Sequence, residues 1–131
     1  MTISLIAIIT ATLVSYVAGS LWYLALGAPW RKALGWVETG VAYKPPVPAL
    51  VVAFVGQLAM AIALGGLFSH LGFSGVRPGL ILGAGLWLGL VLPTLAVNVV
   101  FQQRNPMLIA IDGGHWLLIL AILGGVIGAF S

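Results

Sequence analysis

Four long apolar stretches alternate with short polar connectors along this chain. They cover about residues 3–28, 47–71, 78–102 and 107–130, and the last is interrupted by one acidic residue, Asp112. A stretch of about 24 residues is about 36 Å long as an α-helix, which is enough to cross a hydrocarbon core of about 30 Å. We therefore predict four transmembrane helices. Continuous apolar runs such as residues 5–9 lack the alternation of a membrane β-strand.

The connectors at residues 72–77 and 102–106 are short, so the helices that they join are expected to be antiparallel neighbours. The sequence thus predicts an all-α fold, in which an integral membrane protein forms an antiparallel up-and-down bundle of four transmembrane helices. Residues 1–131 are expected to form a single transmembrane domain.

Composition agrees with a membrane protein and adds an orientation. Of the 131 residues, 62% are hydrophobic and 5% are charged, whereas a soluble domain carries about 25% charged residues. By the positive-inside rule, the cation-rich first and third connectors are cytoplasmic and both termini lie outside the cytoplasm. The net charge of +3 therefore reflects topology and does not indicate nucleic-acid binding. The cations are Arg31, Lys32, Lys44 and Arg104 on the inner side, against Arg77 alone on the outer side.

The first connector combines Trp30, Trp36 and Tyr43 with three cations. Amphipathic rings and cationic side chains suit the headgroup region, so we expect this segment to lie along the inner membrane surface. A ligand-binding lid is the less favoured alternative.

Polar side chains inside the predicted helices are few, and they share one depth range. Because the hydrocarbon core offers no water, such groups should face the bundle, pair with each other or line a cavity. Counted from the predicted cytoplasmic helix ends, they lie about 6 to 15 Å deep, all in the inner half of the bilayer. We predict one polar or ligand-binding layer built from Tyr23, Gln57, Asn98, Asp112 and His115.

The spacing within two helices refines this layer. On the first helix, a stripe of small and polar residues, with spacings of three and four, should face protein: Thr12, Tyr16, Gly19, Tyr23 and Gly27. On the last helix, Asp112 and His115 are three residues apart and hence adjacent on the helix surface. A carboxylate so placed could hold an imidazolium or fix the tautomer of the imidazole, and a structural role is the alternative.

Three interpretations of the layer stay open, in decreasing order of preference: a structural polar layer, a solute or proton site, and catalysis. A metal site is not expected, because His70 falls at the opposite end of its helix from His115 and the remaining ligands are too few. The chain has no cysteine, which excludes disulfides and thiolate-ligated clusters. We predict no catalytic residues, no metal and no cofactor.

Glycines indicate close helix packing. Three pairs have the spacing that lets helix backbones approach in lipid, at 79 and 83, 85 and 89, and 124 and 128. The third helix has two opposed small or polar faces, which hints at a contact with another protomer or subunit. Pro93 is expected to produce a kink. The predicted packing residues are Gly19, Gly85, Gly89, Pro93, Gly124 and Gly128.

Several short motifs resemble those of one family. Gly19-Ser20-Leu21-Trp22-Tyr23 resembles the G-x-x-W-Y signature of the bacterial membrane family called domain of unknown function 1761. The third-helix pattern of Gly83, Trp87, Gly89, Pro93 and Asn98, and the Ile-Asp-Gly-Gly-His stretch at 111–115, are similar to that family in the same order. The chain departs from it at 26–29, where Leu-Gly-Ala-Pro replaces a frequent Phe-Gly. The resemblance implies four helices in a bacterial inner membrane, and it implies no activity.

Three functions are therefore compared. The first is a non-enzymatic scaffold or accessory subunit, which works by packing with itself or within a larger membrane complex, among membrane lipids. The alternative is a small-solute or proton-coupled transporter or binding protein that uses the layer around Asp112 and His115. The third, an enzyme acting on lipid or quinone, is disfavoured because convergent acids, bases and metal ligands are scarce. The sequence favours the scaffold.

Overall fold

The computed structural model describes residues 3–131, and all regular elements in that range are helical. The helices are α1 (Leu5–Ala33), α2 (Val47–His70), α3 (Val76–Leu86), the π-helical turn η1 (Trp87–Val91), α4 (Leu92–Phe101) and α5 (Met107–Ala129). Because α3, η1 and α4 follow each other without a break, they form one span, Val76–Phe101. The four resulting helices are long and apolar enough to cross a membrane, which confirms the predicted fold class.

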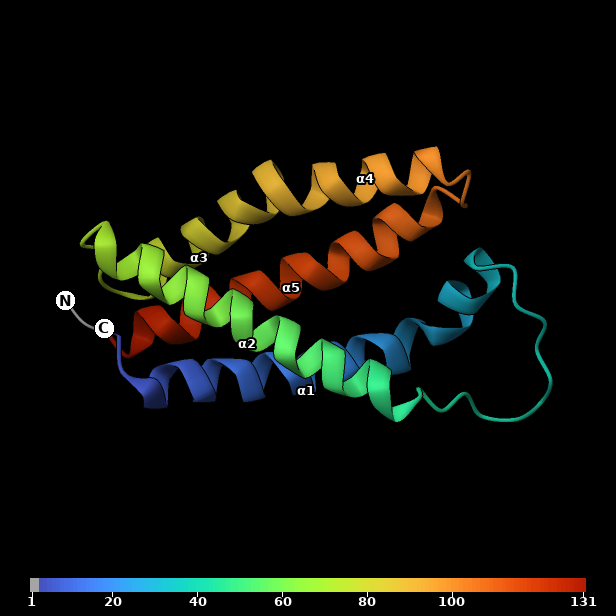
Figure 1. The fold of residues 1–131 in the computed structure, drawn as a ribbon, viewed down its shortest axis with the longest axis horizontal. Coiled ribbons are helices and arrows are strands. Elements are labelled where there is room, and N and C mark those ends of the chain that lie inside the picture. Colours follow the sequence, from blue (N-terminus) through green and yellow to red (C-terminus); the bar gives the residue numbers. More distant parts are fainter. Residues whose placement is uncertain (1–2) are drawn as a thin grey trace.

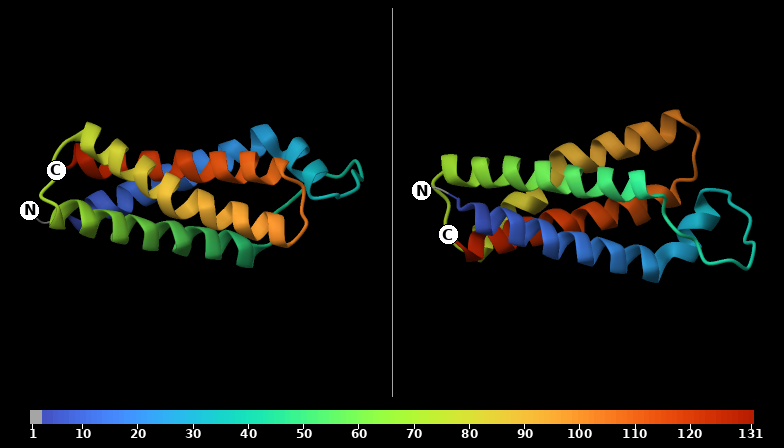
Figure 2. Two further views of the ribbon diagram at one scale, coloured as in Figure 1. Left: turned by 90° about the horizontal axis from the view of Figure 1, so that it is seen from above. Right: turned by 60° about the horizontal axis from the view of Figure 1, so that its bottom comes forward.

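The helices run side by side with alternating direction, and α5 lies at the centre of the bundle (Figures 1 and 2). It packs against α1, α2, α3, η1 and α4, most extensively against α3 and α1, whereas α2 and α3 touch only slightly. The start of α1, the C-terminus and the α2–α3 turn lie at one end of the bundle (Figure 1). The long connector after α1 and the α4–α5 turn lie at the other end.

The core lies mostly along one face of α5. Its largest fully buried side chains include Phe68, Leu64 and Ile119. They pack in one cluster with Ile8 and Ala11 of α1. A smaller cluster near the opposite end is formed by Ala33, Val99 and Leu108. Burial of these apolar groups fills the interior, while the outer helix surfaces carry many exposed leucines, isoleucines and valines, as lipid contact requires.

The closest helix contact joins α3 to α5 through glycines. A Cβ atom on Gly79 would overlap the backbone of Gly124, and one on Gly128 would overlap the carbonyl of Gly75. A Cβ atom on Gly83 would likewise overlap the carbonyl of Leu120. At these positions only glycine permits the observed backbone separation.

α1 is longer than predicted and extends five residues past position 28, to Ala33. The expected end before Pro29 was wrong, because the helix tolerates this proline and resumes its hydrogen bonds, with Leu34 N–H bonded to Trp30 O at 3.0 Å. The proline removes only one donor. The extension brings Trp30 and Arg31 into the helix.

The third span contains a π-helical turn just before Pro93. Leu92 N–H donates to Trp87 O, one residue further back than in an α-helix. Because a proline ring clashes with the preceding turn and offers no N–H, the wider π turn accommodates Pro93 without breaking the helix. The distortion expected at Pro93 is thus a turn that contains one extra residue. After this turn, α4 diverges from α2 (Figure 2).

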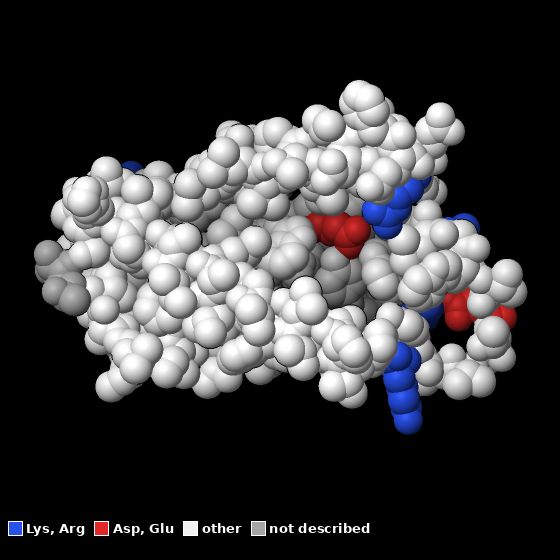
Figure 3. Space-filling model, in the orientation of Figure 1, with Lys and Arg blue, Asp and Glu red and all other residues white. Residues whose placement is uncertain are grey.

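Charges are divided unequally between the two ends (Figure 3). Arg31 and Lys32 lie in the last turn of α1, and Lys44 and Arg104 lie in the two connectors at the same end. Arg77 lies in the first turn of α3 at the other end. Arg31 is paired with Glu38 in the connector, at 3.0 Å. The fold therefore separates the cations as the topology prediction requires.

Candidate functional site

The turn of α5 that contains Asp112 is held by two tryptophans from different helices. Trp22 of α1 donates its indole N–H to Ile111 O at 3.1 Å. Trp87 of η1 donates its indole N–H to Gly113 O at 2.8 Å. These bonds reach backbone carbonyls on either side of Asp112 along the chain, so they fix the position of this turn between α1 and the third span.

Two glycines make room for the rings at this contact. A Cβ atom on Gly114 would lie 2.8 Å from the Trp22 ring, and a Cβ atom on Gly19 would lie 2.8 Å from His115 Nε2. Gly19 and Trp22 therefore belong to the same face of α1, three residues apart, and they fit the face of α5 that carries His115. The first-helix motif and the last-helix motif pack directly against each other.

Tyr23 joins the two ionisable residues of α5. Its hydroxyl donates to Asp112 Oδ1 at 2.5 Å, and its ring lies against the His115 ring with centroids 4.7 Å apart. Within residues 3–131 no hydrogen bond or ion pair links Asp112 to His115 directly. The phenol from α1 takes the carboxylate oxygen instead, so the two α5 residues are linked only through Tyr23. We call Tyr23, Asp112 and His115 the α1–α5 polar cluster.

His115 lies inside the bundle, with 6% of its surface exposed. Its Nδ1 is buried, and no protein atom of residues 3–131 forms a hydrogen bond with it. The ring packs between Tyr23 and Trp116, whose centroid is 4.6 Å away. Aromatic surfaces thus hold the imidazole, and no hydrogen bond from the described residues fixes the orientation of its Nδ1.

Gln57 and Asn98 do not join the α1–α5 polar cluster. Gln57 of α2 is buried and accepts a hydrogen bond from Ser15 of α1 at 2.7 Å, which is a separate contact one turn from Gly19. Asn98 of α4 is exposed on the bundle surface. The structure therefore assembles three of the five predicted residues and assigns the other two to different surroundings.

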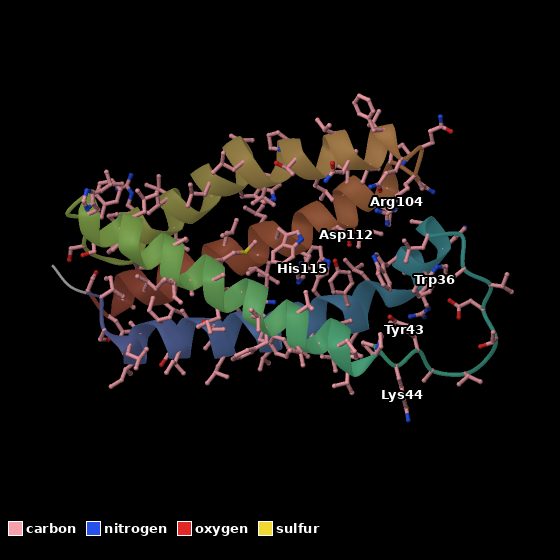
Figure 4. All side chains as sticks on the ribbon, viewed as in Figure 1. Trp36, Tyr43, Lys44, Arg104, Asp112 and His115 are labelled. Atoms are coloured by element: carbon pink, nitrogen blue, oxygen red, sulfur yellow. The ribbon has the colours of Figure 1, made fainter. Side chains whose placement is uncertain are left out.

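The α1–α5 polar cluster opens to the outside. Figure 3 shows the Asp112 carboxylate at the edge of a hollow on the bundle surface, with the blue atoms of Arg104 beside it. Figure 4 shows that His115 lies further into the bundle and that the connector aromatics Trp36 and Tyr43 lie toward the connector end. Asp112 is half-buried, and within residues 3–131 no cation lies within ion-pair distance of it.

Aromatic rings extend from the cluster to the connector. Tyr23 contacts Trp30 with centroids 5.3 Å apart, and Trp30 contacts Trp36 at 5.4 Å. Tyr43 completes this group, 5.4 Å from Trp36. These edge contacts fold the connector back onto α1, so it forms an ordered aromatic wall near the hollow.

Sequence analysis missed the structural roles of Trp22, Trp87 and Ser15. The two tryptophans were noted only as parts of motifs, although an indole N–H inside a membrane needs a hydrogen-bond partner, and this requirement was the available signal. Ser15 was not singled out from the sequence. Its bond to Gln57 depends on how α1 and α2 pack, and local spacing does not reveal that.

The outer face of the third span is a second feature of interest. Gly85 and Gly89 are exposed, and a Cβ atom on either would meet nothing within 4 Å. Gly79 and Gly83 of the same span face α5. The predicted opposition of two faces is thus visible, with one face covered by α5 and the other uncovered by residues 3–131.

This fold and site define a class of protein: a small, all-helical protein with four membrane-compatible spans and a carboxylate within one of them. The chain belongs to the family described as Protein of unknown function (DUF1761), whose sequence model matches residues 6–128. No curated protein and no solved structure matches the chain. Among residues 3–131, no three His, Cys, Asp or Glu side chains gather where they could hold a metal ion.

Proposed function

We propose that this protein is a non-enzymatic membrane protein that binds a polar or ionic group at the α1–α5 polar cluster. The observation that carries the proposal is the half-buried Asp112 carboxylate, which borders a surface hollow and has no cationic partner in residues 3–131. An ionisable group within a span is costly, and such groups commonly mark binding or transport paths.

The rigidity of the cluster supports binding. Tyr23 fixes one oxygen of Asp112, while Trp22 and Trp87 fix the backbone around it. A site whose side chains are already positioned loses little conformational freedom when a ligand binds. The cluster brings one carboxylate, one phenol and one imidazole together without an activated nucleophile, which is why we propose binding and no reaction.

A membrane-permeant, apolar carbodiimide provides the test, because it modifies carboxyl groups that it reaches from the lipid phase. We expect it to label Asp112 in delipidated detergent solution and to label it several-fold less in native membranes, where a bound molecule protects the site. Asp112→Asn should abolish this labelling, while Glu38→Gln, which removes the chain's other carboxylate, should leave it unchanged. Equal labelling in both preparations, or none in either, would contradict the proposal.

The role of scaffold or accessory subunit, which the sequence favours, is a second candidate. It is supported by the uncovered face of the third span, where Gly85 and Gly89 leave space for another helix backbone. The two candidates are compatible, since an oligomer could present one α1–α5 polar cluster in each protomer. We rank binding first because Asp112 requires a partner, whereas exposed glycines tolerate lipid.

A further inference from the structure

We propose that the hollow at Asp112 binds the headgroup of an amine-bearing phospholipid, with the primary ammonium on Asp112 and the phosphate on Arg104. This inference rests on the proposed binding function and names its ligand class.

Charge is the first argument. The chain has only two acidic side chains, and the one outside the spans, Glu38, is already paired with Arg31. Asp112 has the Tyr23 hydroxyl on one oxygen and no cation within ion-pair distance in residues 3–131. A carboxylate at this depth is stabilised by a cation that also donates hydrogen bonds, and a primary ammonium provides three donors.

Position is the second argument. Asp112 lies five residues after the start of α5, which places it about 8 Å below that helix end. This depth is within reach of a lipid headgroup that tips inward from the adjacent leaflet. Arg104 belongs to the turn just before α5, and Figure 3 shows it beside Asp112 at the edge of the hollow. The cation, Arg104, lies at the mouth of the hollow, and the anion, Asp112, lies inside it. This order complements a lipid headgroup whose phosphate is followed by an ammonium.

The aromatic rings near the hollow are the third argument. Tyr23 lies edge to face with Trp30, and the connector rings of Trp36 and Tyr43 continue this surface toward the connector end. Aromatic faces attract ammonium groups, and tryptophan and tyrosine favour the headgroup region. Because α2 packs little against the third span, the hollow between them is accessible from the side, where a lipid diffuses.

Asp112 is the only aspartate in the chain, so carboxyl-labelled aspartate marks this one site. We would measure the coupling between that ¹³C and the ¹⁵N of labelled phosphatidylethanolamine by solid-state NMR in lipid bilayers. An ion pair predicts a carbon-to-nitrogen distance of about 4 Å. The trimethylated headgroup of phosphatidylcholine, which has no N–H donors, should give much weaker coupling. Absence of coupling to phosphatidylethanolamine would overturn the proposal.

Lipid retention provides a second measurement. In native mass spectrometry, the wild type should retain phosphatidylethanolamine over phosphatidylglycerol by about tenfold, as expected for a charge-assisted hydrogen bond. Asp112→Asn should reduce this ratio to about one, and Arg104→Gln should weaken retention of both phospholipids. Glu38→Gln should match the wild type. An unchanged ratio in Asp112→Asn would contradict the assignment, and if that variant does not fold, the NMR measurement on wild type decides.

Two further results separate the possible failures. Soluble phosphoethanolamine at millimolar concentration should not displace the lipid, because it lacks the acyl chains that hold the headgroup at this depth. Displacement by it would identify a free solute as the ligand and overturn the lipid assignment. If native membranes protect Asp112 from the carbodiimide but phosphatidylethanolamine alone does not restore protection, the ligand class is wrong and the binding function stands. If no protection occurs, both proposals fail.

Discussion

Tyr23 decides the chemistry of its neighbours because it contacts two ionisable residues with different parts of one side chain. The hydroxyl binds Asp112, and the ring covers His115. We therefore expect removal of the carboxylate to change the polarity of the phenol and, through the ring contact, the surroundings of the imidazole. In the described residues, the contacts that join Asp112 and His115 thus run through a side chain of α1.

This arrangement predicts an NMR response. Asp112→Asn should change the ¹⁵N imidazole resonances and the titration of His115, and the same change should be several-fold smaller in a Tyr23→Phe background, because the hydroxyl link is absent. His70, exposed at the opposite end, serves as the internal control and should not respond. A His115 response of equal size in both backgrounds would show that the phenol plays no part.

The adjacent glycines of α5 offer a matched pair of substitutions. A methyl group on Gly114 meets the Trp22 ring at 2.8 Å, while one on Gly113 meets the flexible ends of Leu92 and Leu95 at 3.4 and 3.7 Å. Gly114→Ala should destabilise the protein by about 1–3 kcal/mol through overpacking. Gly113→Ala should be near neutral, because better helix propensity, about 1 kcal/mol, offsets a mild contact. Unfolding in detergent measures both, and equal effects would contradict the packing.

The members of the polar layer could be predicted from the sequence only in part, because depth in the membrane is readable from the sequence and helix rotation is not. Depth in the membrane placed Tyr23, Asp112 and His115 at similar levels, and the structure brings them together. Depth does not specify the angular position of each helix, so it also grouped Gln57 and Asn98 with them. Which side chains form hydrogen bonds between helices depends on how each helix is rotated about its axis. This rotation cannot be read directly from a single sequence.

At the scale of elements, the α3–α5 contact depends on glycines that face one way only. The residues at 79 and 83 touch the α5 backbone, while those at 85 and 89 point away from it. The covered and the uncovered face of the third span thus lie only a few residues apart. The same substitution is therefore expected to have opposite effects on stability at neighbouring glycines.

Gly83→Ala and Gly85→Ala test this directional contact. The first places a methyl group against the carbonyl of Leu120, which belongs to a helix backbone and cannot move aside cheaply. We expect a loss of about 1–3 kcal/mol or more. The second meets open space and should keep or slightly raise stability. Thermal unfolding in the same detergent compares them, and a Gly83→Ala variant as stable as Gly85→Ala would refute the close approach.

Element boundaries were less predictable than element number. Apolar length sets the number of spans, because each must cross the same hydrocarbon thickness. The end of α1 was placed before Pro29, although this proline lies within the helix, and the bend at Pro93 was not recognised as a π-helical turn. In both cases the local cost of proline is offset by packing of the whole helix, which local rules do not include.

For the whole molecule, the separation of cations predicts an orientation that labelling can measure. The chain has no cysteine, so each introduced cysteine is the only thiol. Ser131→Cys should react with an impermeant thiol reagent in intact cells, and Lys44→Cys should react only after permeabilisation. Thr2 would report on the other terminus, and it lies outside the described residues. Labelling of Lys44→Cys alone in intact cells would reverse the topology.

Self-association is predicted from the uncovered face of the third span. Gly85→Leu should leave the monomer folded, since nothing in residues 3–131 lies near its Cβ, and it should weaken association by about tenfold if another helix packs there. Gly66→Leu, on the exposed surface of α2, is the matched control and should not change association. Concentration-dependent energy transfer in bilayers measures it. A wild type that stays monomeric at all concentrations would exclude homo-oligomers.

The π-helical turn η1 has a consequence for chain length. A π turn contains one residue more than the α turn that it replaces, so the span tolerates a deletion there in principle. If the same residues formed a regular α-helix without this π turn, everything after it would be rotated by about 100° relative to Trp87. The indole bond to Gly113 and the burial of Val99 could then no longer be satisfied together. The π turn thus absorbs one residue of surplus length and keeps the two halves of this span in phase with α5.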